Sequence, residues 1–81
     1  IHPSRLGNLP LALLHKGFCT RLLIDQAFAE AGVNLAPGLE MNSVTGILAV
    51  VSAGGFATIL PEQALRLPVS RPLRGYPIEG M

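Results

Sequence analysis

Residues 42–61, NSVTGILAVVSAGGFATILP, limit what this chain can fold into more than any other stretch. The stretch opens with two polar residues that suit a helix N-terminus, and apolar residues then recur at helical spacing. Gly54 and Gly55 are expected to end this helix, and the apolar run 56–60 that follows stops at a proline. A helix, a glycine turn and a buried strand in direct succession are typical of an open α/β sheet.

The preceding half of the chain predicts a similar alternation of strands and helices. Thr20 suits the N-cap of a helix because its hydroxyl can satisfy a first-turn amide, and Gly32 suits the end of that helix. The expected elements in chain order are strand 9–14, helix 21–31, strand 39–41, helix 43–53, strand 56–60, short helix 61–65 and an extended tail. With right-handed crossovers, this order gives a small parallel sheet with flanking helices and the first strand at its centre. In the tail, Val69 could join a sheet edge.

The helix expected at 21–31 has one apolar and one polar face. Arg21 and Asp25 lie one turn apart on the polar face and can pair, which stabilises a helix by about 0.3 kcal/mol. The residues of the apolar face, which we interpret as ordinary core, are Leu23, Ile24, Ala27, Phe28 and Ala31. The polar face has Arg21, Asp25, Gln26 and Glu30.

Charge and composition exclude several classes of protein. The net charge is +1 and the basic residues are scattered, so nucleic-acid binding by this chain itself has no support. The apolar content of 49% argues against disorder. Residues 41–60 carry no charge, but polar residues and the glycine pair interrupt them, which favours a water-soluble core over a membrane span.

Cys19 is the one cysteine, so an internal disulfide is impossible and a reducing compartment is indicated. A catalytic pair of Cys19 with His15 lacks an orienting third group, which argues against an enzyme. His2, His15 and Cys19 do not have the spacing of a metal site. We expect no metal and no cofactor.

A ligand site is expected where the parallel strands end. Ligands of open α/β sheets bind at the carboxyl ends of the strands, beside the point where strand order reverses. In this chain those ends are residues 15–20, 41–43 and 60–61, and each leads into a helix N-terminus whose amides can hold an anion.

Five short motifs, taken together and in order, resemble the second regulatory subdomain of LysR-type transcriptional regulators. They are PLALL at 10–14, TRLLID at 20–25, AG at 31–32, EMNS at 40–43 and SAGGFATILP at 52–61. The resemblance covers about residues 9–65. The chain departs from the family pattern in having adjacent Gly54 and Gly55, where the family usually has Gly-x-Gly.

The resemblance implies half of a type II periplasmic-binding-protein-like domain. Residues 10–65 would be the effector-binding half, 1–9 a crossover segment and 66–81 an extended crossover tail. The resemblance further implies a small-molecule effector, such as a carboxylate, and a homo-oligomer in the cytoplasm. It also implies DNA binding through an N-terminal domain outside this chain. The expected function is therefore effector sensing in transcription, without enzymatic activity.

By position, the resemblance places one wall of the effector cleft at the strand ends. The expected effector-binding residues are Lys16, Phe18, Thr20, Asn42, Ser43 and Phe56. Four of them have an alternative role when the residues are considered without the resemblance. Thr20 and Ser43 could be plain helix caps, Phe18 could cover the sheet, and Lys16 could be solvated instead of pairing with a carboxylate.

Two other functions use related folds. One is a fragment of a type II solute-binding transport protein, against which the GGFATILP ending counts. The other is an enzyme on a related two-domain fold, such as a dehydratase, for which no acid/base pair is evident. Fold alone does not separate these from a regulator.

Overall fold

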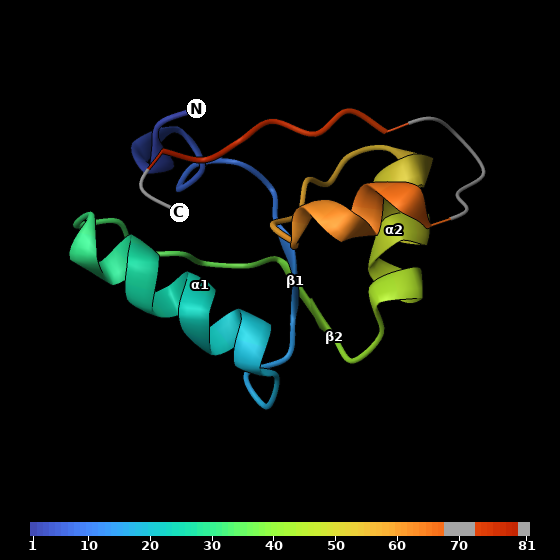
Figure 1. Cartoon of the computed structure of the whole chain (residues 1–81), viewed down its shortest axis with the longest axis horizontal. Coiled ribbons are helices and arrows are strands. Elements are labelled where there is room, and N and C mark those ends of the chain that lie inside the picture. Colours follow the sequence, from blue (N-terminus) through green and yellow to red (C-terminus); the bar gives the residue numbers. More distant parts are fainter. Residues whose placement is uncertain (68–72, 80–81) are drawn as a thin grey trace.

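A computed structural model describes residues 1–67 and 73–79 of the chain, with the elements arranged as in Figure 1. In chain order they are the 3₁₀ helix η1 (Pro3–Arg5), strand β1 (Ala12–Leu14), helix α1 (Cys19–Glu30), strand β2 (Leu39–Met41), helix α2 (Val44–Ala53) and the 3₁₀ helix η2 (Glu62–Arg66). The predicted strand–helix–strand–helix order is therefore confirmed up to the end of α2. None of the helices in the described ranges is long and apolar enough to cross a membrane.

β1 lies between β2 and the segment after α2, which is the predicted position, but in the described residues the sheet itself consists of β1 and β2. β1 pairs in parallel with β2, in a register that sets Ala12 beside Leu39 and Leu14 beside Met41. On its other side, the segment after α2 meets it at a single bridge between Leu11 and Ala57. β1 is shorter than the predicted strand 9–14, but all three of its residues are buried.

The predicted strand 56–60 is wrong. Ala57 alone joins the ladder: its N–H donates to the Pro10 carbonyl at 2.9 Å and its carbonyl accepts from Ala12 N–H at 2.9 Å. The chain then leaves the sheet, although the Ile59 side chain is buried in the core. An apolar run signals burial, and here side-chain burial is achieved without further strand pairing. The run leads into η2 through Pro61, which occupies the cap of that 3₁₀ helix and not its first position as predicted.

α1 begins earlier than predicted, and Thr20 is not its N-cap. The cap residue is Phe18, which offers no side-chain hydrogen bond. A tight turn, in which Phe18 N–H donates to the His15 carbonyl at 3.1 Å, brings the backbone into the helix before Thr20 is reached. The predicted stop at Gly32 is confirmed by its φ of +75°.

The predicted faces of α1 are only partly right. Ile24 and Phe28 are buried as expected, but Leu23 is 64% exposed and Arg21 is only 2% exposed. The helix is rotated so that positions 21, 24 and 28, three and four residues apart, face the sheet. The assignment of Arg21 to the face opposite the core is therefore wrong, while its pairing with Asp25 is confirmed at 2.9 Å.

α2 follows the sequence prediction closely. The Ser43 hydroxyl accepts a hydrogen bond from Gly46 N–H at 3.1 Å, which makes it the predicted N-cap. At the other end Gly54 and Gly55 have φ values of +93° and +91°, a region that disfavours side chains. The glycine pair therefore turns the chain out of the helix as expected.

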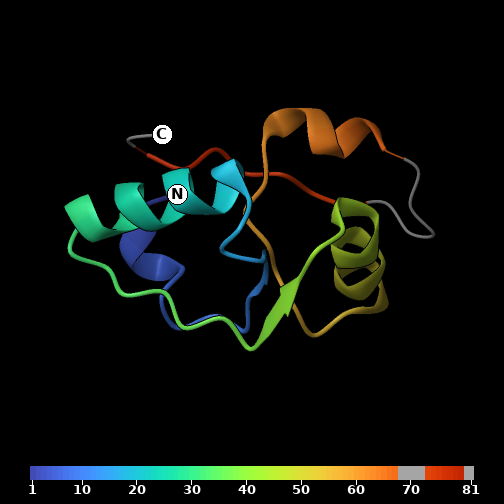
Figure 2. The ribbon, with the colours of Figure 1, turned by 90° about the horizontal axis from the view of Figure 1, so that it is seen from below.

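The helices cover opposite faces of the strands, as Figure 2 shows. The main core lies between β1 and α1. Its buried members are Leu6, Leu11, Leu13, Ile24, Phe28 and Ile59. Ala12 and Leu14 point to the other face because side chains alternate along a strand, and there α2 contributes buried Ile47 and Leu48.

The segment 73–79 returns beside the N-terminus, where Glu79 N–H donates to the Ile1 carbonyl at 2.9 Å. This segment contains neither helix nor strand, in agreement with the predicted extended tail. Ile78 packs against the main core. The predicted edge position of Val69 lies outside the described residues.

Candidate functional site

The carboxyl ends of β1 and β2 lie together at one edge of the sheet. β1 ends at Leu14 and leads into the loop before α1, while β2 ends at Met41 and leads into the turn before α2. His15 N–H donates to the Met41 carbonyl at 2.7 Å, which ties the two connections side by side. The two polar segments that the sequence places at strand ends are therefore neighbours.

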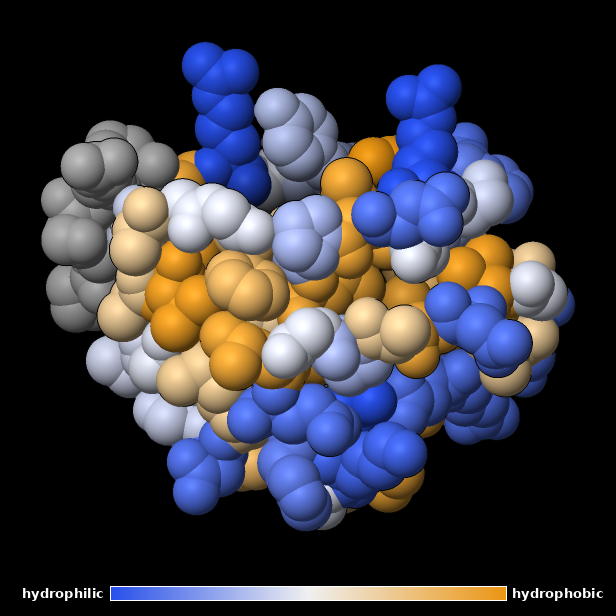
Figure 3. Space-filling model, turned by 180° about the vertical axis from the view of Figure 1, so that it is seen from behind, coloured by the Kyte–Doolittle hydropathy of each residue, from blue (hydrophilic) through white to orange (hydrophobic). Residues whose placement is uncertain are grey.

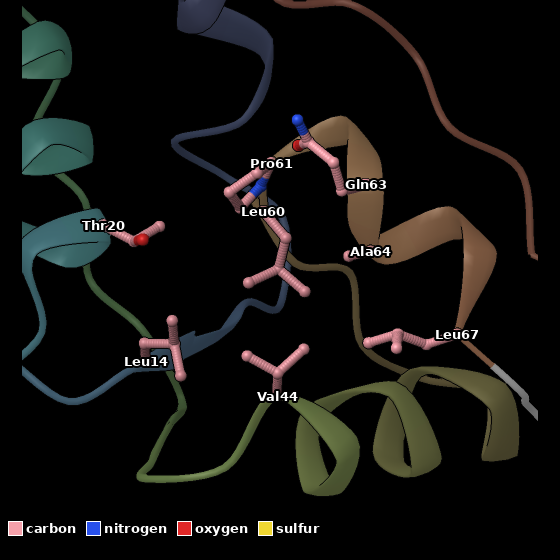
Figure 4. A pocket seen from close by; sticks show the side chains of 8 residues that line it. All are labelled: Leu14, Thr20, Val44, Leu60, Pro61, Gln63, Ala64 and Leu67. Atoms are coloured by element: carbon pink, nitrogen blue, oxygen red, sulfur yellow. The ribbon is translucent and has the colours of Figure 1, made fainter.

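An open groove of about 260 Å³ lies at this edge, where α1, α2 and η2 converge (Figure 4). We call it the apolar groove. Its lining residues are Leu14, Thr20, Val44, Leu60, Pro61, Gln63, Ala64 and Leu67. In Figure 4 the Thr20 side chain reaches in from α1, opposite the aliphatic side chains of Val44 and Leu60. No lining residue is charged, so the groove can hold an apolar body and offer it two hydrogen-bonding side chains, Thr20 and Gln63.

A second concavity, of about 380 Å³, lies by the end of β2 and is lined by His15, Glu40, Met41 and Asn42. We call it the polar hollow. Its imidazole, carboxylate and amide can donate and accept hydrogen bonds. The His15 ring is not free in orientation, because its Nδ1 lies 3.2 Å from Gly17 N–H and accepts a hydrogen bond from it. The sheet edge thus offers one apolar and one polar concavity.

The structure brings five of the six predicted site residues to this edge. Thr20 lines the apolar groove and Asn42 lines the polar hollow. Lys16 and Phe18 are exposed in the loop before α1. Ser43 sits between the strand end and α2, with its hydroxyl already engaged as the helix cap.

Phe56 lies apart from the other predicted site residues. It directly precedes Ala57, which pairs with Leu11 before β1 begins. Its ring edge comes within 3.3 Å of the position that a Cβ would take on Gly38, the residue before β2. Phe56 therefore covers the amino ends of the strands, opposite the two concavities.

Several lining residues were not predicted as site residues. The sequence prediction put Val44 in a helix, Leu60 in a buried strand and Leu67 in the tail. Their place in the apolar groove depends on how η2 folds back over α2. His15 and Glu40 carried a local signal, because each adjoins a predicted strand end. A rule based on strand ends could have identified His15 and Glu40 as lining residues. No local sequence signal identifies Leu67 as one.

Arg21 joins three elements beneath this edge. Its Nη1 donates to the Leu14 carbonyl at 2.9 Å and to Glu40 Oε2 at 2.7 Å, and its Nε donates to Asp25 Oδ1 at 2.9 Å. Burial of the guanidinium by itself lowers the pKa of Arg21, but the hydrogen bonds and charges of Asp25 and Glu40 outweigh it and the pKa is raised. The guanidinium therefore remains charged throughout the usual pH range.

Comparison with known proteins identifies a family and two relatives to which this chain is similar. A family model described as "LysR substrate binding domain" matches residues 1–81. The chain is 33% identical over 62 residues to a protein of Synechococcus elongatus named "Probable nitrogen assimilation transcriptional activator", covering 76% of this chain and 20% of that protein. It is 31% identical over 85 residues to the "RuBisCO operon transcriptional regulator" of Acidithiobacillus ferrooxidans, covering 98% of this chain and 28% of that protein. The chain thus spans between a fifth and three tenths of the length of these relatives.

Proposed function

Since this chain belongs to the LysR substrate binding domain family, we propose that it forms one wall of an effector site in a LysR-type transcriptional regulator. The observation that carries the proposal is the meeting of α1, α2 and η2 around an uncharged groove at the carboxyl end of β1. This is where ligands bind in open parallel sheets. The names of the two relatives support a role in transcription.

The two concavities suggest the chemistry of the effector. An apolar part of the ligand would lie against Val44 and Leu60, with Thr20 as its hydrogen-bond partner. A polar part would meet Asn42 and, if it is a carboxylate, the ammonium of Lys16. Ser43 can still offer its hydroxyl proton to a ligand while its oxygen accepts from Gly46. Phe56 would act only through the packing at the amino ends of the strands.

We also propose the organisation that the family resemblance implies. Residues 10–65 would form the effector-binding half, and residues 1–9 and 66–81 would be crossover segments to the other half. The parent protein would bind DNA through a separate domain and act in the cytoplasm as a binding protein, not as an enzyme. Ile1 and Glu79 lie side by side, which suits two crossovers that leave at one place.

Exposed apolar side chains support an oligomer. Leu22 and Leu23 on α1 are 56% and 64% exposed. Figure 3 shows hydrophobic atoms at the surface across the middle of the face opposite that of Figure 1. Exposed apolar patches favour association with another protein surface, and a second copy of the parent protein is the partner we propose.

The groove can be tested by filling it. Ala64→Leu adds a larger side chain to the groove, whereas Ala29→Leu places the same side chain on the exposed surface of α1. We expect metabolites that raise the melting temperature of the parent protein to lose at least tenfold in affinity for Ala64→Leu and to bind Ala29→Leu normally. Equal affinity of both variants, measured by calorimetry, would count against the groove as the effector site.

A further inference from the structure

We propose that Arg21 is a positioning residue of the site, which sets the relation between the loop before α1 and the turn before α2. Arg21 lies at the base of the site without lining either concavity. The proposal rests on the proposed function where it identifies these connections as the effector site. The positioning itself is a statement about this chain alone.

The contacts of Arg21 reach the last parts of both strands. The Leu14 carbonyl is the last of β1, and Glu40 precedes Met41, whose carbonyl holds His15 N–H. One nitrogen, Nη1, donates to both the Leu14 carbonyl and the Glu40 carboxylate. It therefore fixes the distance between the ends of β1 and β2. Arg21 also directly follows Thr20, so the same anchor sets where α1 begins relative to the apolar groove.

The guanidinium is rigid and buried, whereas its partners are not. The Arg21 side chain is 3% exposed, while those of Asp25 and Glu40 are 36% and 40% exposed. A planar guanidinium presents five N–H donors in a fixed fork, which the single ammonium of a lysine cannot reproduce. Arg21 is therefore the buried member of both pairs, and the two carboxylates meet it from partly exposed positions.

The two carboxylates differ in what they connect. Asp25 lies one turn along the same helix, so its pairing with Arg21 joins α1 only to itself. Glu40 lies on β2, so its pairing joins helix to strand. If Arg21 positions the strand ends, the ion pair with Glu40 matters for the site and the ion pair with Asp25 does not.

Amide hydrogen exchange in the 81-residue chain distinguishes the effects of these two ion pairs. The matched variants are Glu40→Gln and Asp25→Asn, each of which removes one negative charge beside the same guanidinium while keeping the side-chain shape. The reporter is His15 N–H, which is bonded to the Met41 carbonyl and to neither mutated group. The reference is Ile47 N–H in α2, which donates to the Ser43 carbonyl at 3.0 Å and belongs to a fully buried residue, so that a general loss of stability changes both exchange rates together.

We expect Glu40→Gln to raise the amide exchange rate of His15 relative to that of Ile47 at least fivefold and to move the amide resonances of Thr20 and Asn42. Asp25→Asn should leave the ratio within twofold. Arg21→Lys should act like Glu40→Gln, and if it fails to fold, the carboxylate pair alone decides. An unchanged ratio in Glu40→Gln, or the same rise in both carboxylate variants, would overturn the proposal. No effector enters this experiment, so failure of the effector site would appear separately, in the calorimetry of Ala64→Leu.

Discussion

Two substitutions of Ser43 can separate its role as a helix cap from its proposed contact with the ligand. Its hydroxyl accepts from Gly46 N–H at 3.1 Å, and α2 then supplies buried Ile47 and Leu48 to the core. Removing a serine cap costs about 1 kcal/mol when alanine replaces it but only a few tenths, about 0.3 kcal/mol, when glycine does. The reason is that glycine leaves the amide open to water and suits the non-helical backbone of a cap.

Both substitutions remove the hydroxyl, so only their stabilities should differ. With a urea dependence of about 1–1.5 kcal/mol per molar for a chain of this size, Ser43→Ala should lower the unfolding midpoint by roughly 0.7–1 M. Ser43→Gly should lower it by less than half as much. If Ser43 contacts the effector, both variants should lose affinity alike in calorimetry of the parent protein. Equal midpoints for the two variants, measured by circular dichroism, would refute the capping argument.

Five further substitutions test the packing and the backbone. Phe28→Ala should cost about 3–5 kcal/mol because this side chain is 1% exposed in the main core, and a loss of cooperative thermal unfolding would report it. Gly54→Ala should cost about 1–2 kcal/mol at a φ of +93°, whereas Gly17→Ala, where no positive φ is required, should be nearly neutral in urea titration. Leu23→Gln should change the unfolding free energy by less than about 0.5 kcal/mol, but Ile24→Ala should cost about 2–4 kcal/mol. A similarly large cost for both would instead support the apolar face expected from sequence.

Features with local causes were predictable from the sequence. The ends of α2 follow from a hydroxyl that caps the first turn and from two glycines that leave the helix, and both signals lie within a few residues. The position of most expected site residues at one edge follows from topology, because parallel strands end on the same side. That rule places Thr20 and Asn42 at this edge without any knowledge of packing, while their role in effector binding stays a prediction.

The errors concern features that depend on distant parts of the chain. Arg21 is buried because Glu40 and the Leu14 carbonyl meet it there, and helical periodicity cannot show partners on two strands. The segment after Ala57 keeps its Ile59 side chain buried but leaves the sheet, and an apolar run does not distinguish these cases. The position of Phe56 also depends on packing: its ring lies against Gly38 at the amino ends of the strands, and its role in effector binding stays a prediction.

The effector site is tested most directly by recording amide chemical shifts of the isotopically labelled parent protein while an effector is added. The effector used is a metabolite that raises the melting temperature of that protein. Amides of Thr20, Asn42 and Val44 should shift in a saturable way, while those of Gly32 and Phe56 stay within the spread of unaffected residues. Saturable shifts centred on the outer surface of α1 or on the amino ends of the strands, with none at Thr20 and Asn42, would contradict an effector site at the carboxyl edge of the sheet.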